Sequence, residues 1–555
     1  MRIPDHIRRH LVTLLPGRDD VRALPRTWRR DVLAGLTVGV VALPLALAFG
    51  VSSGMGAAAG LVTAIVAGVV AAVFGGSNVQ VSGPTGAMAV ILAPIVAAHG
   101  PHAVVVISIL AGLILVAAGV LRLGRVAVYI PWPVIEGFTA GIAIIIALQQ
   151  VPFALDVRTP AGHSPLVAAG EAISAARPPE ALIALGMTVA VVVIIELLRA
   201  WRATFPGALL AVIAATLVAE ASGLGIARIG ELPASLPAPS IPLVDPAVLP
   251  TLLSPALAVA VLAAIESLLS ARVAAGMAPT GRVLPDREVF GQGLASIASG
   301  IFGGMPATGA IARTAVAVRA GARTRLAAIV HALLLLGVVA FGSGLAGRIP
   351  MAALAGVLVA TTLHMVDLAQ VRELLRISRG TAITFAVTIV CTVALDLITA
   401  VEVGVVLAAF FALRALAATT SVTREPLPGP AQAGDDHIAV LRLEGSLFFG
   451  AADKVMEDIA GSEAWVVVLR FSKLEMLDPT GAHRLTELID LLEARGATVI
   501  IKGLRGRHGR VAERAGVLQA LRDPEHVFTD LPAAVAHARS HVARQLAGEP
   551  VPPRP

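Results

Sequence analysis

The sequence predicts a polytopic α-helical membrane protein of about 14 spans, arranged as two inverted repeats of seven, with a small soluble α/β domain after them. Three observations support this prediction. Of the 555 residues, 56% are hydrophobic and only 14% are charged, a balance that excludes an ordinary soluble protein of this length. Arginines are concentrated in alternate loops between the apolar segments, and a short motif of Pro, Thr, Gly and Ala recurs in the third segment of each half.

About fourteen apolar segments have nearly the roughly 20 residues that a bilayer requires, and the two that contain the repeated motif are shorter. They cover residues 32–50, 57–74, 84–98, 103–121, 134–151, 181–198, 205–220, 255–273, 288–303, 307–319, 325–342, 350–366, 382–398 and 400–418. No cleavable signal peptide is expected, because the first segment follows Arg29-Arg30-Asp31 and is long enough to span. Asp396 and Glu402 flank a short outer turn and are expected to be solvated.

The charge of the loops tests the number of segments independently. One set of alternate loops contains Arg122, Arg125, Arg199, Arg202, Arg272, Arg282, Arg287, Arg319, Arg323, Arg325, Arg372, Arg376 and Arg379. By the positive-inside rule, this alternation predicts an even number of spans in the inner (plasma) membrane, with both termini cytoplasmic. The formal net charge of +6 is then an orientation signal, and nucleic acid is not an expected partner. The proline-rich stretch 221–254 divides the segments into two sets of seven.

Two helix starts inside the membrane contain the repeated motif. Gly83-Pro84-Thr85-Gly86-Ala87 in the third segment corresponds to Pro306-Ala307-Thr308-Gly309-Ala310 in the tenth. Proline at a first helical position, small residues that leave backbone N–H groups uncovered, and a hydroxyl beside them suit an anion at a helix N-terminus. Arg313, one turn further on, adds a full positive charge. Paired broken segments point to the central site of a transporter, whereas the alternative is a chance match, because Gly and Pro are common in transmembrane helices.

Glu266 lies in the middle of an apolar segment, where a buried carboxylate costs at least ~2.5 kcal/mol. We expect it to be functional and to couple transport to protons. Two facing helix N-termini supply about +1 together, Arg313 adds one charge and ionised Glu266 subtracts one, so protonation leaves about +2 and favours a dianion. The alternative is a carboxylate that only pairs with Arg313.

The composition changes after Leu416, and lysine appears for the first time. Alternating residues at 438–443 and an apolar run at 465–471 predict strands, and a helix at 481–495 with a strand at 497–501 completes an α/β unit. The predicted organisation is a cytoplasmic tail (1–30), a transmembrane domain (31–420), a linker (421–436), a soluble domain (437–545) and a disordered tail (546–555).

Other classes of protein are disfavoured by what the sequence contains. It has no Gly-x-x-x-x-Gly-Lys-Ser/Thr pattern for a nucleotide-driven pump. Its intramembrane acids are scattered, and His331 and His364 lack partners at ligand spacing, so we expect no enzyme, no catalytic residue, no metal and no cofactor. The single cysteine, Cys391, excludes an internal disulfide.

Four separated motifs together resemble the sulfate-permease (SulP) family of solute carrier 26-type anion transporters. They are the span-one pattern around Pro44, Gly-Pro-Thr-Gly at 83–86, Ile-Glu-Ser-Leu-Leu-Ser at 265–270, and Pro-Ala-Thr-Gly-Ala at 306–310 with Arg313. The resemblance covers about residues 30 to 545. It implies a core domain and a gate domain, an anion held between the helix ends of spans three and ten, and a homodimer in lipid.

Matched position by position, the resemblance also implies the site residues. The substrate-binding residues would be Phe49, Thr85, Gly86, Ala87, Thr308, Gly309 and Ala310, and the coupling and charge residues would be Glu266, Ser270 and Arg313. One position departs from the family pattern, because many members have glutamine directly after the span-one proline, where this chain has Leu45.

The soluble segment resembles a STAS domain, the module shared with bacterial anti-sigma-factor antagonists. In those proteins, a serine that is phosphorylated follows the aspartate before the helix, whereas here Asp478 is followed by Pro479. A phosphorylation switch of that kind is therefore not expected, and the remaining Thr480 is expected to cap the helix.

These inferences predict a secondary active transporter of small anions of the sulfate, bicarbonate or dicarboxylate class, working by proton-coupled symport and alternating access. An anion exchanger or an anion channel of the same fold is the alternative. The sequence leaves open which anion is carried, and whether sodium takes the place of protons.

Overall fold

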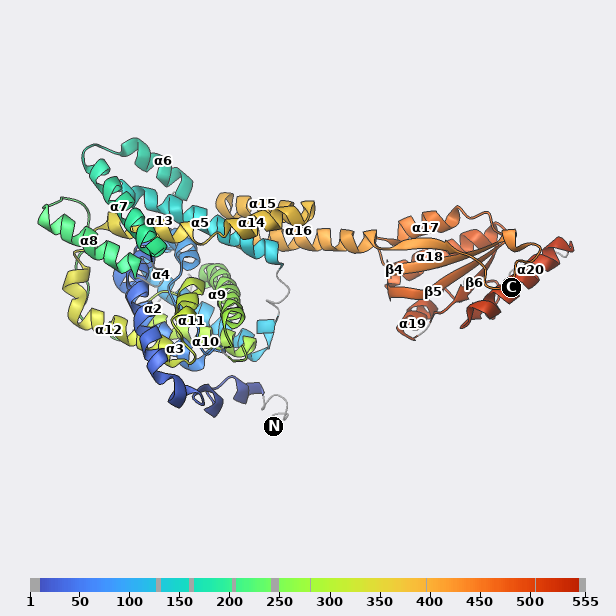
Figure 1. Cartoon of the computed structure of the whole chain (residues 1–555), viewed down its shortest axis with the longest axis horizontal. Helices are drawn as coiled ribbons and strands as arrows, with labels where there is room; N and C mark the ends of the chain where they lie inside the picture. The colour runs from blue at the N-terminus through green and yellow to red at the C-terminus, as the bar shows by residue number, and fades with distance from the viewer. Residues whose placement is uncertain are drawn as a thin grey trace. The chain divides into compact units, whose positions relative to one another are not determined.

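The computed structural model describes residues 10–125, 131–158, 164–201, 206–240, 249–279, 281–395, 397–504 and 506–548. Residues 1–9 of the predicted N-terminal tail, Asp396 and residues 549–555 of the predicted C-terminal tail lie outside the described residues. Contacts within the chain divide it into two units, Met1–Val405 and Val406–Pro555, and Figure 1 labels many of their helices and strands.

The first unit is built almost entirely of helices. Its elements are η1 (Arg18–Asp20), α2 (Leu24–Ser52), α3 (Ala57–Phe74), β1 (Ser82–Gly83), α4 (Gly86–Val120), α5 (Trp132–Ala154), α6 (Pro165–Ala175), α7 (Glu180–Trp201), α8 (Gly207–Ala221), α9 (Leu249–Met277), α10 (Pro285–Ile301), β2 (Thr308–Gly309), α11 (Ile311–Arg319), α12 (Leu326–Ala346), α13 (Met351–Leu363), α14 (Leu368–Ile377), α15 (Arg379–Ala394) and α16 (Leu397–Ala418), which continues into the second unit.

Each apolar segment predicted from the sequence coincides with a helix or part of one. The segments 84–98 and 103–121 are the two parts of α4, which is interrupted at Gly100, where φ is 76°. Among the described residues, nine helical stretches are long and apolar enough to cross a membrane, and three further apolar helices are shorter. The many-helix membrane fold is thus confirmed, while the number of 14 crossings stays a prediction.

The helices of the first unit pack mainly in two groups. One contains α2, α3, α4, α9, α10, α11 and α12, and the other contains α5, α6, α7, α13 and α15. Small residues allow the closest approaches, as they do in membrane helix pairs generally. A Cβ atom added to Gly112 of α4 would lie 2.6 Å from the carbonyl oxygen of Gly293 of α10, and the reverse distance is also 2.6 Å.

Charged side chains tie the N-terminal tail to these helices. Asp20 accepts hydrogen bonds from Nη1 and Nη2 of Arg287 at 2.9 and 2.7 Å, and Nη2 of Arg325 lies 3.0 Å from the same carboxylate. Burial raises the pKa of Asp20, but the two arginines and the backbone N–H of Gly17 outweigh it, and the pKa lies below its ordinary value. Part of the loop arginine content therefore has a structural role as well as an orienting one.

The second unit is a five-stranded sheet covered by helices on both faces. Its elements are β3 (Ser421–Glu425), η3 (Asp435–His437), β4 (Ile438–Leu447), α17 (Ala452–Ala460), β5 (Val466–Leu477), α18 (Pro479–Ala494), β6 (Thr498–Lys502), α19 (Gly506–Arg514), β7 (Val527–Phe528) and α20 (Leu531–Leu546). The strand order is β3-β4-β5-β6-β7, in which only the β3–β4 pair is antiparallel. Alternate residues of β4 belong to two apolar clusters, one on the side of α17 and α18 and one on the side of α20.

Two expectations for this unit were wrong in detail. The predicted linker contains strand β3 at its start, where Glu425 forms ion pairs with Arg442 of β4 (2.6 Å) and Arg470 of β5 (2.5 Å). The residue that caps α18 is Asp478, whose Oδ1 accepts the N–H of Gly481 at 2.6 Å, and not Thr480. Pro479 takes the first helical position, which needs no N–H donor.

Candidate functional site

The two repeated motifs meet in the first unit. Strands β1 and β2 pair antiparallel, with Ser82 opposite Gly309 and Gly83 opposite Thr308. Each strand leads directly into a helix, β1 into α4 and β2 into α11. The pairing therefore brings two broken helices from the two halves of the chain to one place.

Glu266 of α9 joins the two motifs. Its Oε2 accepts a hydrogen bond from the hydroxyl of Thr85 at 2.8 Å and another from the hydroxyl of Thr308 at 2.7 Å. The two hydroxyl oxygens lie 3.1 Å apart. Thr85 is also the N-cap of α4, since its oxygen accepts the N–H of Met88. One carboxylate thus holds both threonines that the sequence singles out.

Arg313 lies at the same place but does not pair with Glu266. Its side chain is buried, its Nη2 donates to the carbonyl oxygen of Pro84, and a Cβ atom on Gly83 would lie 2.8 Å from its Nη1. That Nη1 has no hydrogen-bond partner among the described residues. No ion pair within this part of the chain joins Arg313 to Glu266, so the carboxylate is held by hydroxyls, and the guanidinium donates to the backbone before α4.

The two copies of the motif differ in which of their N–H groups are free. Gly86 and Ala87 begin α4, and their N–H groups have no acceptor among the described residues. The equivalent N–H groups of the second copy are bonded, that of Gly309 to Ser267 Oγ at 2.9 Å and that of Ala310 to the carbonyl of Val81 at 2.9 Å. Helix α11 begins one residue later, at Ile311, without a side-chain cap, so the free donors within the motif itself lie at the start of α4.

Two further predicted residues line or support this place. Phe49 of α2 lies against the start of α4, because a Cβ atom on Gly86 would be 3.3 Å from its ring and 2.3 Å from Cδ1 of Ile146 on α5. Ser270 of α9 has no hydrogen bond to Glu266 among the described residues. Its hydroxyl donates to Thr314 Oγ1 at 3.1 Å, and the same oxygen accepts the N–H of Val81 at 3.1 Å. Ser270 therefore helps to position the helices around the motifs.

The buried carboxylate of Glu288 on α10 was missed by the sequence analysis. Its Oε2 accepts the N–H groups of Gly76 at 2.7 Å and Ser77 at 3.0 Å, and its Oε1 accepts the side-chain amides of Gln80 at 2.8 Å and Gln292 at 2.9 Å. Three of these bonds fix the segment that leads into β1, and the fourth comes from the same helix as Glu288. The only sequence signal was an acidic residue in the first turn of a helix, a common position that rarely indicates burial.

Residues 28–388 match the family described as the Sulfate permease family. The chain belongs to the sulfate permease family. Residues 430–534 match the STAS domain, so both resemblances noted in the sequence are confirmed.

Among the relatives of this family member, a putative sulfate transporter, YvdB of Bacillus subtilis, is 31% identical, with 90% of this chain and 96% of that protein covered. The bicarbonate transporter BicA of Synechocystis is 32% identical over 89% and 91% of the two chains. The structure of the murine Slc26a9 anion transporter in the inward-facing state superposes with a TM-score of 0.82, covering 96% and 95% of the two chains at 17% identity. That last comparison supports the fold alone.

Proposed function

We propose that this protein is a secondary active transporter of small anions and that it works by proton-coupled symport, with Glu266 as the coupling group. The family and the relatives described as sulfate and bicarbonate transporters support small oxyanions as the substrate class. The observation that carries the coupling proposal is the pair of hydrogen bonds from Thr85 and Thr308 to one oxygen of Glu266.

The coupling argument rests on the number of hydroxyl protons. Each threonine hydroxyl has one proton to donate, and both protons are given to ionised Glu266 in this arrangement. An anion bound at the same place needs those protons itself, because its charged oxygen atoms only accept hydrogen bonds. A proton on Glu266 removes the competing charge and frees the hydroxyls, so that the proton and the anion bind together.

The proposed anion site lies at the start of α4. The free N–H groups of Gly86 and Ala87, together with the helix dipole of about +0.5, supply donors and charge. The hydroxyls of Thr85 and Thr308 complete the donor set, and buried Arg313 supplies the full positive charge that a dianion requires. Phe49 and Ile146 would exclude water from one side, while Gly309 and Ala310 shape the other.

The arrangement of Arg313 bears on the alternative of an exchanger. A permanently charged site would favour a direct pair between Arg313 and Glu266, and the structure has none among the described residues. This observation supports symport over exchange. The alternating-access interpretation is supported by the two groups of helices, which we assign to a core (with α4, α9 and α11) and a gate (with α5 and α13).

The domain roles and the location are part of the same proposal. Both termini would be cytoplasmic in the plasma membrane, as the loop arginines indicate, and the STAS domain would regulate transport or assembly of a homodimer without forming part of the substrate path. A reporter fused to either terminus tests the orientation. A STAS domain detected outside the cell would contradict it.

Uptake by the purified protein in liposomes tests the transport function. We expect uptake of labelled sulfate or bicarbonate to saturate as its concentration rises. Uptake should also be faster when unlabelled substrate is present inside the liposomes, because a carrier with bound substrate returns across the membrane more readily than an empty one. A panel of unlabelled sulfate, bicarbonate and dicarboxylates as competitors identifies the substrate. A flux that rises linearly with external substrate concentration and does not change with internal substrate would indicate a channel instead.

A further inference from the structure

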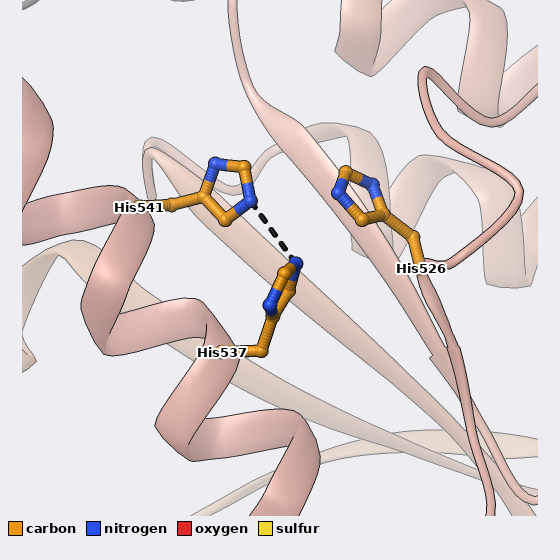
Figure 2. A group of neighbouring side chains, drawn as sticks. All are labelled: His526, His537 and His541. Carbon is orange, nitrogen blue, oxygen red and sulfur yellow. Dashed lines mark hydrogen bonds between the residues drawn. The ribbon is translucent and has the colours of Figure 1, made fainter.

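Three histidines gather in the second unit, far along the chain from the proposed anion site. They are His526, in the segment before β7, and His537 and His541 on α20. Nitrogen atoms of the three rings, one from each, all lie within 4.8 Å of one another, and Nε2 of His541 is 3.2 Å from Nε2 of His537. Figure 2 shows the three rings turned toward a common centre from two separate elements.

The spacing along α20 explains why two of the rings share one side. His537 and His541 are four residues apart, about one helical turn, so their side chains lie one above the other on the same face. The neighbouring positions Ala534, Ala538 and Val542 are buried against the sheet. The packing of this adjacent stripe fixes the rotation of α20 and directs both histidines toward the segment before β7.

Two backbone hydrogen bonds, one from the N–H and one to the carbonyl of His526, hold this residue in place. Its N–H donates to the carbonyl of Asp523 at 3.0 Å, and its carbonyl accepts the N–H of Ile501 at 2.8 Å. His526 is 2% exposed, and its Nδ1 has no hydrogen-bond partner among the described residues. A buried ring nitrogen without a partner is uncommon in folded proteins, and a bound metal ion would supply that partner.

The charges around the cluster bear on the kind of ion. The charged groups that face the rings are Arg522, Asp523 and Arg544, and Arg522 pairs with Glu493 at 2.8 Å. This surrounding does not attract a cation by charge alone, so an ion must be held by bonds to nitrogen. Three imidazole nitrogens suit Zn²⁺, whereas Mg²⁺ and Ca²⁺ are excluded because they take oxygen ligands.

We propose that His526, His537 and His541 bind a zinc ion, with water as the fourth ligand, and that this ion ties α20 to the segment before β7. From the sequence we expected no metal, and the proposed zinc site departs from that expectation. It is independent of the anion site, because none of its residues belongs to the transmembrane unit.

Zinc content of the full-length protein in detergent tests the proposal. The protein is purified through a tag without histidine, stripped with EDTA, incubated with ZnCl₂ and dialysed, and bound zinc is measured by mass spectrometry. We expect wild type to hold one zinc per chain and the His537→Ala and His541→Ala variants to bind at least about tenfold more weakly. The matched control is His483→Ala, a histidine of the same unit whose side chain is 69% exposed.

A second measurement separates loss of the site from loss of the fold. Co²⁺ added to wild type should give the visible absorption bands of a four-coordinate site, and zinc should raise its thermal unfolding midpoint. The His541→Gln variant should unfold at the wild-type temperature without metal and show neither the bands nor the zinc-dependent rise. Zinc retained equally by wild type and His537→Ala, or no zinc retained by wild type, would overturn the proposal.

Discussion

Thr85 and Thr308 are 223 residues apart in the chain, yet their hydroxyl oxygens lie 3.1 Å apart and donate to the same oxygen of Glu266. The antiparallel pairing of β1 with β2 produces this relationship. The two copies of the motif thereby place two equivalent threonines beside a single acid.

The first prediction concerns the hydroxyl of Thr308. Thr308→Val keeps the shape of the side chain but removes the donor, and we expect uptake in liposomes to fall roughly 10- to 100-fold, which corresponds to one lost hydrogen bond to a charged or anionic group. Thr308→Ser retains the hydroxyl and should keep most of the activity. Equal uptake by the two variants would show that the hydroxyl takes no part in transport.

The second prediction concerns the side chains that lie next to Gly86 at the start of α4. Gly86→Ala places a methyl group where Ile146 Cδ1 and the ring of Phe49 now lie, at 2.3 and 3.3 Å, so it should obstruct the proposed site and reduce uptake at least about tenfold. Adding Ile146→Ala removes the closest atom and should restore part of the activity. Gly337→Ala is the control, because nothing lies within 4 Å of a Cβ at that position. A Gly86→Ala variant with normal uptake would place the anion elsewhere.

The third prediction concerns the structural acid Glu288. Glu288→Ala leaves the N–H groups of Gly76 and Ser77 buried without an acceptor, each at a cost of about 1–3 kcal/mol. We expect the thermal unfolding midpoint of the purified protein to fall by at least about 5 °C. The matched change Glu402→Ala, at an exposed position of α16, should have no such effect. Similar midpoints for the two variants would remove the structural role assigned to Glu288.

The sequence was sufficient to predict the features that depend on local pattern. Apolar length identified the helices, and the repeated motif identified Thr85 and Thr308, because helix starts have local signatures. Glu266 stood out because an acid in the middle of an apolar run is costly. The sequence could not predict that Glu266 contacts the threonines rather than Arg313. The partner of Glu266 depends on how α9 packs against β1 and β2.

The features that were missed depend on contacts distant in sequence. In the sequence, Ile146 is one apolar residue among many, and only the folded structure shows that it lies next to Gly86. Glu288 looked like an ordinary first-turn acid, and its four donors come from another segment and from its own helix. The histidine pair on α20 did have a local signal in its four-residue spacing, but the third member, His526, comes from a different element. The strand at 421–425 was hidden because its polar residues resemble a linker.

The fourth prediction concerns the pH dependence of the second unit. Burial raises the pKa of Glu425, but hydrogen bonds and charges from Arg470 and Arg442 outweigh it, and the pKa lies below its ordinary value. A lowered pKa in the folded state means that Glu425 adds stability above the ordinary carboxyl pKa, and that this contribution is lost as the pH falls through the lowered value.

Thermal unfolding of the full-length protein checks this prediction. Glu425→Gln should lower the unfolding midpoint of the STAS domain at pH 7, and the difference from wild type should shrink as the pH is taken down toward 3. A difference that stays constant over this range would mean that the ion pairs of Glu425 contribute no pH-dependent stability.

The coupling role of Glu266 is the central claim, and proton movement during uptake measures it most directly. Wild type and Glu266→Gln are reconstituted in liposomes that contain a pH-sensitive dye, and substrate is added outside. We predict that wild type acidifies the interior as substrate enters, and that Glu266→Gln gives no acidification, whether or not it still moves the anion. Wild-type uptake that ignores a pH gradient, or a Glu266→Gln variant that still carries protons inward, would contradict the account.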